Sequence, residues 1–304
     1  MESMASDPQN TSTGTSPDSS SKPESPVTDE MVSTLAKTFM VAHVDDSDEH
    51  LAQALVYNAA RMAWRMREIG LTTEMKTSVS DVVTAADRAA EKFISEVLRG
   101  IRPEDGLLGE EGASAESESG RTWVIDPVDG TYNFTTGSDY WCSALALVEG
   151  DPDDPDTVIF GAVHRPAMGY TWFGGPDIPT TRDGDAVGDL EDVTPDSTCL
   201  GGYLHPTDIA KPERQAAWAS VATQFATVRM LGSASIDLAG VATGNLGCWM
   251  QRSVASWDWL PGRALVEGAG GTTARVQAAG VEWFIAGADS SVQEAARALR
   301  EQGE

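Results

Sequence analysis

Apolar residues recur at intervals of three or four in two segments near the start of the chain, a spacing typical of amphipathic helices. The first segment covers residues 51–69 and ends at Gly70. The second begins near Thr84, and Pro103 lies just beyond its last apolar position. The pattern therefore predicts two amphipathic helices, joined by a polar and mobile connection over residues 72–82.

Short apolar segments replace the helical spacing after residue 106, and Gly, Pro and acidic residues separate them. They predict strands at 123–125, 144–148, 157–163 and 169–173, then an exposed excursion over 174–197. Further strands are expected at 199–204, 227–231, 247–251, 272–276 and 283–286, with helices at 212–225, 236–243, after 258 and at 291–301. Strands and helices mixed without regular alternation predict the α+β class, with layered sheets and helices.

The chain divides into three regions by composition. Residues 1–45 are rich in Ser, Thr, Pro, Asp and Glu, so we expect a disordered acidic tail that buries too little apolar surface to fold. Residues 46–190 form an expected N-terminal α+β region, and residues 191–304 an expected C-terminal α/β region. A length of 304 residues is enough for one large or two moderate domains with a sizeable core.

The formal net charge of −26 argues against nucleic acid or an anionic membrane as the main partner. The cysteines (Cys142, Cys199 and Cys248) are odd in number and scattered, which fits reduced thiols in a cytoplasm rather than disulfides or a zinc site. The chain has no run of about 18 apolar residues. It also lacks a basic start followed by an apolar core. We therefore expect a cytoplasmic protein.

The most informative stretch is residues 123–134, WVIDPVDGTYNF. Its first three residues predict a short buried strand that ends at Asp126, and Asp129 follows three residues later. A carboxylate pair at a strand end suits hard cations. The turn Gly130-Thr131 opens a helix, and backbone N–H groups at such a turn suit a phosphate. A metal beside a phosphate indicates metal-assisted phosphoryl chemistry.

Two further groups of acidic residues accompany this stretch. Glu110-Glu111 follows a short apolar segment and Gly109, and Asp258 stands where a helix should begin. Each has an ordinary explanation alone, since an acidic pair in a turn is usually solvated and an Asp before a helix is usually an N-cap. Together with the carboxylate pair, they supply the bridging and flanking groups with which two Mg²⁺ ions activate a water and stabilise a leaving oxygen.

Four motifs in the same order resemble the inositol monophosphatase family of Mg²⁺-dependent, lithium-sensitive phosphatases. They are DVVTAAD at 81–87, GEE at 109–111, the stretch at 123–134, and WD at 257–258 followed by ALVEGAGG at 264–271. The resemblance covers roughly residues 48–300. It implies the layered α/β/α/β/α sandwich of the inositol monophosphatase and sugar phosphatase type. It also implies a homodimer that hydrolyses a small phosphorylated metabolite by direct attack of water.

The resemblance implies a set of Mg²⁺ ligands. Glu110, Asp126 and the backbone carbonyl of Val128 would hold one ion. Asp126, Asp129 and Asp258 would hold a second, and Glu110 would help to seat a more labile third. The site would therefore belong to the N-terminal region and be completed from the C-terminal region.

The resemblance also implies catalytic and phosphate-binding groups. Thr131, with Glu110 and a metal held by Asp126, would polarise the attacking water. The phosphate would bind beside Asp129 and accept hydrogen bonds from the backbone N–H groups of Gly130 and Thr131.

Three auxiliary groups follow from the same resemblance. Asp87 and Glu111 would orient the groups that bind metal, since ligands need such partners. Lys76 would lie on a mobile loop, up to Asp81, that closes over the metals.

The alcohol side of the substrate would contact Gly232, Ser233, Ala234 and Gln251. Gln251 stands where animal inositol monophosphatases carry a glutamate that binds inositol hydroxyls; it keeps hydrogen bonding but loses the charge. An inositol monophosphate is therefore the first expectation. Histidinol phosphate and adenosine 3′,5′-bisphosphate are alternatives with the same metal chemistry, although a histidinol phosphate site would favour an acidic group for the amine.

An alternative of another class is a catalytically silent, metal-binding interaction protein. The intact set of acidic and hydroxyl groups argues against it, because a degenerate relative should have lost at least one of them: Glu110, Asp126, Asp129, Thr131 and Asp258.

Overall fold

The computed structural model describes residues 27–70, 73–75 and 82–302 of the chain. Its helices are α1 Asp29–His43, α2 Asp48–Ile69, α3 Ala85–Ile101, α4 Thr131–Thr135, α5 Pro206–Ile209, α6 Pro212–Ala222, α7 Ala234–Ala242, α8 Ser256–Gly268 and α9 Asp289–Glu301, with a 3₁₀ turn at Pro195–Ser197. Its strands are β1 Thr73–Met75, β2 Val82–Thr84, β3 Gly106–Gly109, β4 Ser114–Ala115, β5 Arg121–Asp129, β6 Cys142–Glu149, β7 Thr157–Arg165, β8 Tyr170–Gly175, β9 Ile178–Arg182, β10 Asp185–Ala186, β11 Cys199–Tyr203, β12 Thr227–Arg229, β13 Cys248–Arg252, β14 Thr272–Ala278 and β15 Val281–Gly287.

The strands build two large sheets and a small ribbon. The eight-stranded sheet has the order β10-β9-β8-β7-β6-β5-β3-β4, and the five-stranded sheet has the order β12-β11-β13-β15-β14. Neighbouring strands of the larger sheet are antiparallel except for the parallel pair β3 and β5. Strands β1 and β2 pair with each other at the start of α3. The site described below lies where β3 and β5 end.

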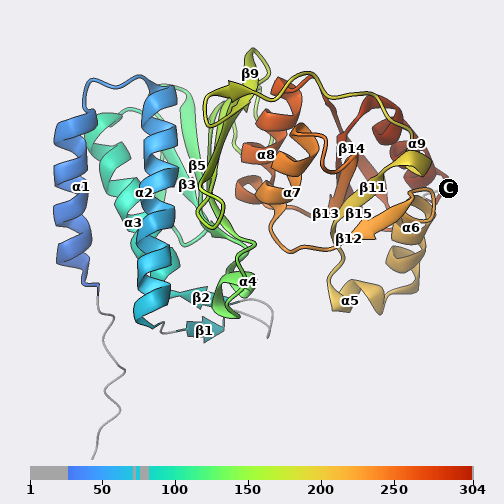
Figure 1. Cartoon of the computed structure of the whole chain (residues 1–304), viewed down its shortest axis with the longest axis horizontal. Helices are drawn as coiled ribbons and strands as arrows, with labels where there is room; N and C mark the ends of the chain where they lie inside the picture. Colours follow the sequence, from blue (N-terminus) through green and yellow to red (C-terminus); the bar gives the residue numbers. More distant parts are fainter. Residues whose placement is uncertain (1–26, 71–72, 76–81, 303–304) are drawn as a thin grey trace, which may run out of the picture.

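Helices and sheets stack in the order α/β/α/β/α (Figure 1). Helices α2 and α3 cover one face of the eight-stranded sheet, and α7 and α8 fill the space between the two sheets. Helices α6 and α9 cover the other face of the five-stranded sheet. The expected α+β sandwich is confirmed. Of the helices described, none is long and apolar enough to cross a lipid bilayer.

Central strands bury both of their faces, which explains their unbroken apolar runs. In β5, Trp123 and Ile125 pack under α2 and α3, whereas Val124 packs against the layer of α7 and α8. In β13, Trp249 faces α7 and α8, and Met250 faces α6 and α9. Side chains alternate across a strand, so each central strand joins two hydrophobic cores.

Helix α1 corrects the expectation of disorder over residues 1–45 for its own residues, Asp29–His43, whereas residues 1–26 lie outside the described part of the chain. Thr28 caps the helix by accepting the backbone N–H of Met31, and the acidic first turn complements the helix dipole. Its buried residues are Val32 and Ala36, and Phe39 packs edge-to-face on Phe93 of α3 at 5.3 Å between ring centroids. The helix is therefore stabilised by a partner helix that composition does not reveal.

The expected excursion over 174–197 is only partly exposed. Strand β9 extends the large sheet, and Thr180 in it is buried. The Thr180 hydroxyl donates to the carbonyl of Leu265 in α8 at 2.7 Å, so this segment is fixed to the central helix layer. The predicted connection at 72–82 ends in β1 and β2, and its residues 76–81 lie outside the described part of the chain.

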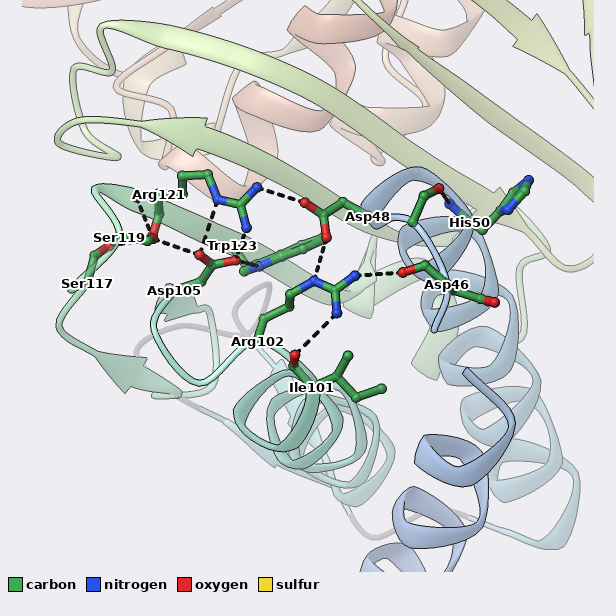
Figure 2. Close-up of polar contacts among 11 residues, drawn as sticks. Asp46, Asp48, His50, Ile101, Arg102, Asp105, Ser117, Ser119, Arg121 and Trp123 are labelled. Atoms are coloured by element: carbon green, nitrogen blue, oxygen red, sulfur yellow. Dashed lines mark hydrogen bonds and ion pairs between the residues drawn. The ribbon is translucent and has the colours of Figure 1, made fainter. Parts of the chain in front are cut away.

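A polar network fastens the start of β5 to two helices (Figure 2). The guanidinium of Arg121 donates to Asp48 at the start of α2 and to Asp105 before β3, at 2.7 and 2.8 Å. Arg102, the C-cap of α3, donates to the other oxygen of Asp48 at 2.5 Å, and the indole of Trp123 donates to Asp105 at 2.8 Å. The start of α2, the end of α3 and the start of β5 are thus held together.

Candidate active site

Strand β5 ends in two carboxylates that a regular strand would point to opposite faces, because residues three apart alternate sides. Asp126 pairs with Ala144 and Asp129 pairs with Cys142, so the two residues 127 and 128 of β5 oppose the single residue Ser143 of β6. This β-bulge at 127–128 redirects the strand. It brings Asp126 and Asp129 to the same place, where their oxygens and a carboxylate oxygen of Asp258 lie within 4.8 Å of one another.

Asp258 reaches this cluster from the first turn of α8. The N-cap of that helix is Ala255, three residues earlier, so Asp258 is not the N-cap that its position before a helix first indicated. Its backbone N–H bonds to the carbonyl of Ala255 at 3.1 Å. The carboxylate is partly buried and completes a group drawn from both halves of the chain.

Glu110 lies beside Asp126 because β3 and β5 run parallel and in register. Gly109 pairs with Ile125, and the N–H of Glu110 donates to the Ile125 carbonyl at 3.2 Å. The next positions along the two strands are therefore Glu110 and Asp126. After burial, the charge of Glu110 is the strongest cause that raises the pKa of Asp126.

Burial and mutual repulsion disfavour the charged forms of the carboxylates in the cluster. Burial raises the pKa of Asp126 well above its ordinary value, and the charges of Glu110, Asp129 and Asp258 raise it further. Burial also raises the pKa of Asp129, although hydrogen bonds from Ser235 oppose the shift. Several converging carboxylates, two of them buried, offer only hard oxygen donors. Such a set fits Mg²⁺ or a similar divalent cation.

Asp129 is bound by the N-terminus of α7. The backbone N–H groups of Ala234 and Ser235 donate to its two oxygens at 3.2 and 2.5 Å. Ser233 caps the helix. Three of the residues predicted to contact a substrate alcohol, at 232–234, therefore lie beside Asp129 and Gly130.

Gly130 and Thr131 form the turn that opens α4. Gly130 adopts φ +96°, and a Cβ there would lie 3.0 Å from the carbonyl oxygen of Gly232, so both backbone conformation and space favour glycine. The hydroxyl of Thr131 lies 3.1 Å from Asp87 Oδ1 and 3.0 Å from the carbonyl of Val128, either of which can accept its proton. The site thus places a hydroxyl and a helix start beside the carboxylates.

Asp87 acts on Thr131 from the first turn of α3. It also accepts the N–H and hydroxyl of Thr84, the N-cap, which completes a capping box. Burial raises the pKa of Asp87 to about 6, with Glu111 adding to the shift and the hydrogen bonds from Thr84 and Thr131 opposing it. The predicted auxiliary residue Asp87 therefore contacts the predicted catalytic hydroxyl.

Two further residues shape the site and were not singled out from the sequence. The amide of Asn133, in the motif at 123–134, donates to the carbonyl of Leu231 at 2.7 Å and holds the loop before α7. Glu91 of α3 accepts the N–H groups of Glu111 and Ala113 in the turn after β3. Position in the motif could have indicated Asn133. The sequence does not indicate a role for Glu91 in the site, because a glutamate in an amphipathic helix normally lies on the exposed face.

Among the described residues, the predicted substrate contact Gln251 has no hydrogen bond to the cluster. Gln251 lies near the end of β13, partly buried, where it pairs with Tyr203 and Phe284. Its contact with a substrate stays a prediction. Lys76 falls outside the described residues.

Comparison with protein families gives one match over most of the chain. The model described as the inositol monophosphatase family matches residues 41–302. The match includes all four motifs, at 81–87, 109–111, 123–134 and 257–271, and every carboxylate of the cluster.

Individual relatives agree with this match. An inositol-1-monophosphatase of Rhizobium meliloti is 30% identical over 239 residues, covering 77% of this chain and 88% of that protein. A histidinol-phosphatase of Mycobacterium tuberculosis is 30% identical over 235 residues, covering 74% of this chain and 85% of that protein. Among solved structures, the extragenic suppressor protein suhB of Bartonella henselae superimposes with a TM-score of 0.73 at 23% identity, covering 83% of this chain and 98% of that one.

Proposed function

The chain belongs to the inositol monophosphatase family, and from this membership we propose that it is a Mg²⁺-dependent phosphomonoesterase of small phosphorylated alcohols, with myo-inositol monophosphate as the first substrate. The observation that carries the proposal is the convergence of Asp126, Asp129 and Asp258 beside the hydroxyl of Thr131. Carboxylates gathered next to a helix start suit a metal and a phosphate at once.

Two groups of ligands are proposed around the shared carboxylate of Asp126. Glu110 and the carbonyl of Val128 would join it on one side, and Asp129 and Asp258 on the other. Bound Mg²⁺ would lower the pKa of a water and neutralise charge on the phosphate and the leaving oxygen. The bulge at 127–128 supports this assignment, because it interrupts the regular pairing of β5 between the two carboxylates, at the position of Val128.

Thr131 is proposed to orient the attacking water. Its hydroxyl proton is directed to Asp87 or to the Val128 carbonyl, so the lone pairs of its oxygen are left to accept a hydrogen bond from water. Accepting that bond would aim a lone pair of the water at the phosphorus. Glu110, across the cluster, would accept the second proton of the water. Asp87 thus contributes by fixing the direction of the Thr131 hydroxyl.

The phosphate is proposed to bind at the start of α4. The first backbone N–H groups of a helix have no partner within it and favour an anion. Gly130 and Thr131 present these groups beside the carboxylate cluster. The left-handed conformation of Gly130 permits the close approach.

The identity of the alcohol is proposed from the named relatives. The inositol-1-monophosphatase from Rhizobium supports inositol monophosphate, and the histidinol-phosphatase from Mycobacterium supports histidinol phosphate as the second candidate. The two candidates differ in charge, because only histidinol carries an amine. The neutral Gln251 favours the uncharged inositol ring.

The proposal is tested by phosphate release from the purified protein with Mg²⁺ present. The panel would contain inositol 1-phosphate, histidinol phosphate, adenosine 3′,5′-bisphosphate and fructose 1,6-bisphosphate. We expect the highest kcat/KM for inositol 1-phosphate. A preference for histidinol phosphate would select the second candidate, and no turnover of any ester would favour the catalytically silent, metal-binding class.

Two substitutions separate metal binding from water orientation. Asp126→Asn should abolish Mg²⁺-dependent turnover. Thr131→Val should lower kcat by roughly 100-fold while the Mg²⁺ concentration for half-maximal activity stays near that of the wild type, consistent with the usual size of a general acid–base contribution. Thr131→Ser, which keeps the hydroxyl, should retain most activity. Glu294→Gln on α9 is the control, since Glu294 is an exposed surface residue.

A homodimer is proposed on family membership alone. Light scattering of the purified protein measures its mass directly, and a monomer at micromolar concentration would contradict the assignment.

A further inference from the structure

Glu91 is a buried carboxylate that faces the turn after β3. It lies in the second turn of α3, and only 4% of the residue is exposed. Its Oε2 accepts the backbone N–H of Glu111 and its Oε1 accepts the backbone N–H of Ala113, each at 2.7 Å. One side chain therefore binds two backbone groups of a single turn, and buried carboxylates paired in this way form strong, directional bonds.

The turn has room for this carboxylate because position 109 is a glycine. Gly109 closes it by donating its N–H to the carbonyl of Ala113 at 2.8 Å. A Cβ on Gly109 would lie 2.6 Å from the carboxyl carbon of Glu91 and 3.0 Å from the Cβ of Ala113. Glycine is needed here for space rather than for an unusual backbone conformation, because the φ angle of Gly109 is not positive.

Glu110 stands inside this turn and is held from both sides. On one side its N–H donates to the Ile125 carbonyl of β5 at 3.2 Å. On the other side, Glu91 binds the next residue, Glu111. The direction in which the Glu110 carboxylate leaves the backbone is therefore set by β5 and by α3 together.

The same helix also reaches the hydroxyl of the site. Asp87 lies one turn before Glu91 on α3 and contacts Thr131. Residues four apart lie on one face of a helix. This face of α3 consequently fixes two separate parts of the site, the Thr131 hydroxyl and the turn that carries Glu110.

We propose that Glu91 is a positioning residue that holds the Glu110 turn against β5 and thereby sets the affinity of the carboxylate cluster for Mg²⁺. The inference rests on the proposed function only in naming Mg²⁺ as the cation. Glu91 acts through the turn and not by touching the substrate or the cation. Partners that orient metal ligands typically change metal affinity or activity by about 10- to 100-fold when they are replaced.

Glu91→Gln is the primary test. Glutamine has nearly the same shape, but only one of its two terminal atoms accepts hydrogen bonds, so its NH₂ group would face a backbone N–H. We expect the Kd for Mg²⁺, measured by calorimetric titration of the metal-free protein, to rise by about 10-fold or more. At saturating Mg²⁺, kcat should return close to the wild-type value, a split between affinity and turnover that a general loss of folding would not produce.

Ser95→Ala provides the matched control. Ser95 lies one turn further along α3, is equally buried, and donates its hydroxyl to the backbone carbonyl of Glu91 at 2.7 Å. Within the described part of the chain, the Ser95 side chain forms no hydrogen bond with the turn. Its replacement should lower the melting temperature slightly and leave the Mg²⁺ affinity unchanged. Equal Mg²⁺ affinities of Glu91→Gln and wild type, or equal losses in Glu91→Gln and Ser95→Ala, would overturn the proposal.

A double-mutant cycle tests the contact from the other side and remains informative if Glu91→Gln folds poorly. Gly109→Ala should weaken Mg²⁺ binding in the wild-type background, because the new methyl group displaces the Glu91 carboxylate. In a Glu91→Ala background the same change should add little, because the obstructing carboxylate is gone. Additive effects of the two substitutions would show that they act independently and would contradict the inference.

The titration also separates this inference from the proposed function. If no phosphate ester is hydrolysed but Mg²⁺ binds and Glu91→Gln weakens that binding, the proposed activity fails and the role of Glu91 stands. If esters are hydrolysed and Glu91→Gln leaves the Mg²⁺ affinity unchanged, the activity stands and the role of Glu91 fails.

Discussion

The carboxylate of Asp129 accepts the backbone N–H of Ser235 at 2.5 Å, although 106 positions separate the two residues. The bond joins the end of β5 in the large sheet to the start of α7 in the layer between the sheets. Because Asp258 comes from α8 of the same layer, neither half of the chain holds the carboxylate cluster alone. Formation of the site therefore depends on the packing of the two halves.

Asp126→Asn should stabilise the metal-free protein. Burial and neighbouring carboxylates raise the pKa of Asp126, so the folded protein binds this proton more tightly than the unfolded chain does. Stability of the metal-free protein therefore falls as pH rises above the ordinary pKa of 3.8. Asparagine removes the charge and still accepts the N–H of Val128. In EDTA at pH 8, urea denaturation should give a free energy of unfolding higher by about 1 kcal/mol or more.

Asp129→Asn should not raise the free energy of unfolding of the metal-free protein in the way that Asp126→Asn does. Its two oxygens accept N–H groups from Ala234 and Ser235, and an amide can satisfy only one of them. A buried N–H left without an acceptor costs about 1–3 kcal/mol. The Asp129→Asn protein should therefore be less stable than Asp126→Asn by that amount under the same conditions. Equal stabilities of the two variants would show that the bonds to α7 contribute nothing.

Gly130→Ala should lower both stability and activity. An alanine at φ +96° costs roughly 1–2 kcal/mol in backbone strain, and its Cβ would also press on the carbonyl of Gly232 at 3.0 Å. Gly188→Ala is the control, because Gly188 has φ +84° but nothing within 4 Å of a new Cβ. Urea denaturation should show a loss of about 1–2 kcal/mol for the control and a larger loss for Gly130→Ala. Similar losses of unfolding free energy in Gly130→Ala and Gly188→Ala would mean that the backbone near Gly232 moves away from the new methyl group at no cost.

Asp208→Asn should destabilise the C-terminal region strongly. The buried Asp208 carboxylate accepts hydrogen bonds from Arg214 at 2.5 Å and from Nε of Arg252 at 2.6 Å. Without the anion these guanidinium groups lose their partner, which typically costs about 3–5 kcal/mol. The exposed pair of Glu294 and Arg297 is the control, and Glu294→Gln should change the free energy of unfolding by at most about 1 kcal/mol. A comparable small change for Asp208→Asn would contradict the expectation.

His164 should make the protein less stable in mild acid. Burial lowers its pKa from 6.5 to about 4, and its ring bonds to the Thr171 hydroxyl at 2.8 Å. The unfolded chain takes up the proton first, so the contribution of neutral His164 is complete above pH 6.5 and is lost as pH falls toward 4. The size of the shift corresponds to about 3 kcal/mol. Urea denaturation of His164→Asn between pH 7 and 4.5 should show a smaller decline in the free energy of unfolding than wild type, and an equal decline would contradict the expectation.

Local patterns were enough to predict part of the site. Asp126, Asp129 and Thr131 lie within six residues, so the strand end and helix start that hold them could be inferred without a tertiary structure. Thr84 and Asp87 are similarly local, because a capping box involves residues three apart. The β-bulge was not predicted, since it depends on how β5 pairs with β6.

Contacts between distant elements account for what the sequence left unpredicted. Helix α1 carries several apolar residues, but only Val32 and Ala36 are fully buried, and its stability comes from packing on α3. Glu91 looks like a solvated helix residue until the turn after β3 covers it. Ser235 donates its backbone N–H to Asp129, and residue identity does not encode a backbone contact.

The polar network at Arg121 has a consequence for the metal-free protein (Figure 2). Strand β5 is fastened at its start to Asp48 and Asp105, and near its end Asp129 is bound by α7. We expect a strand held at both ends to resist fraying, so that its amide hydrogens exchange through openings that also detach α2 or α7. The carboxylates of β5 should then stay assembled in the cation-free protein. Binding of the proposed cation would require partial desolvation of the ion and of an assembled site, but no local refolding.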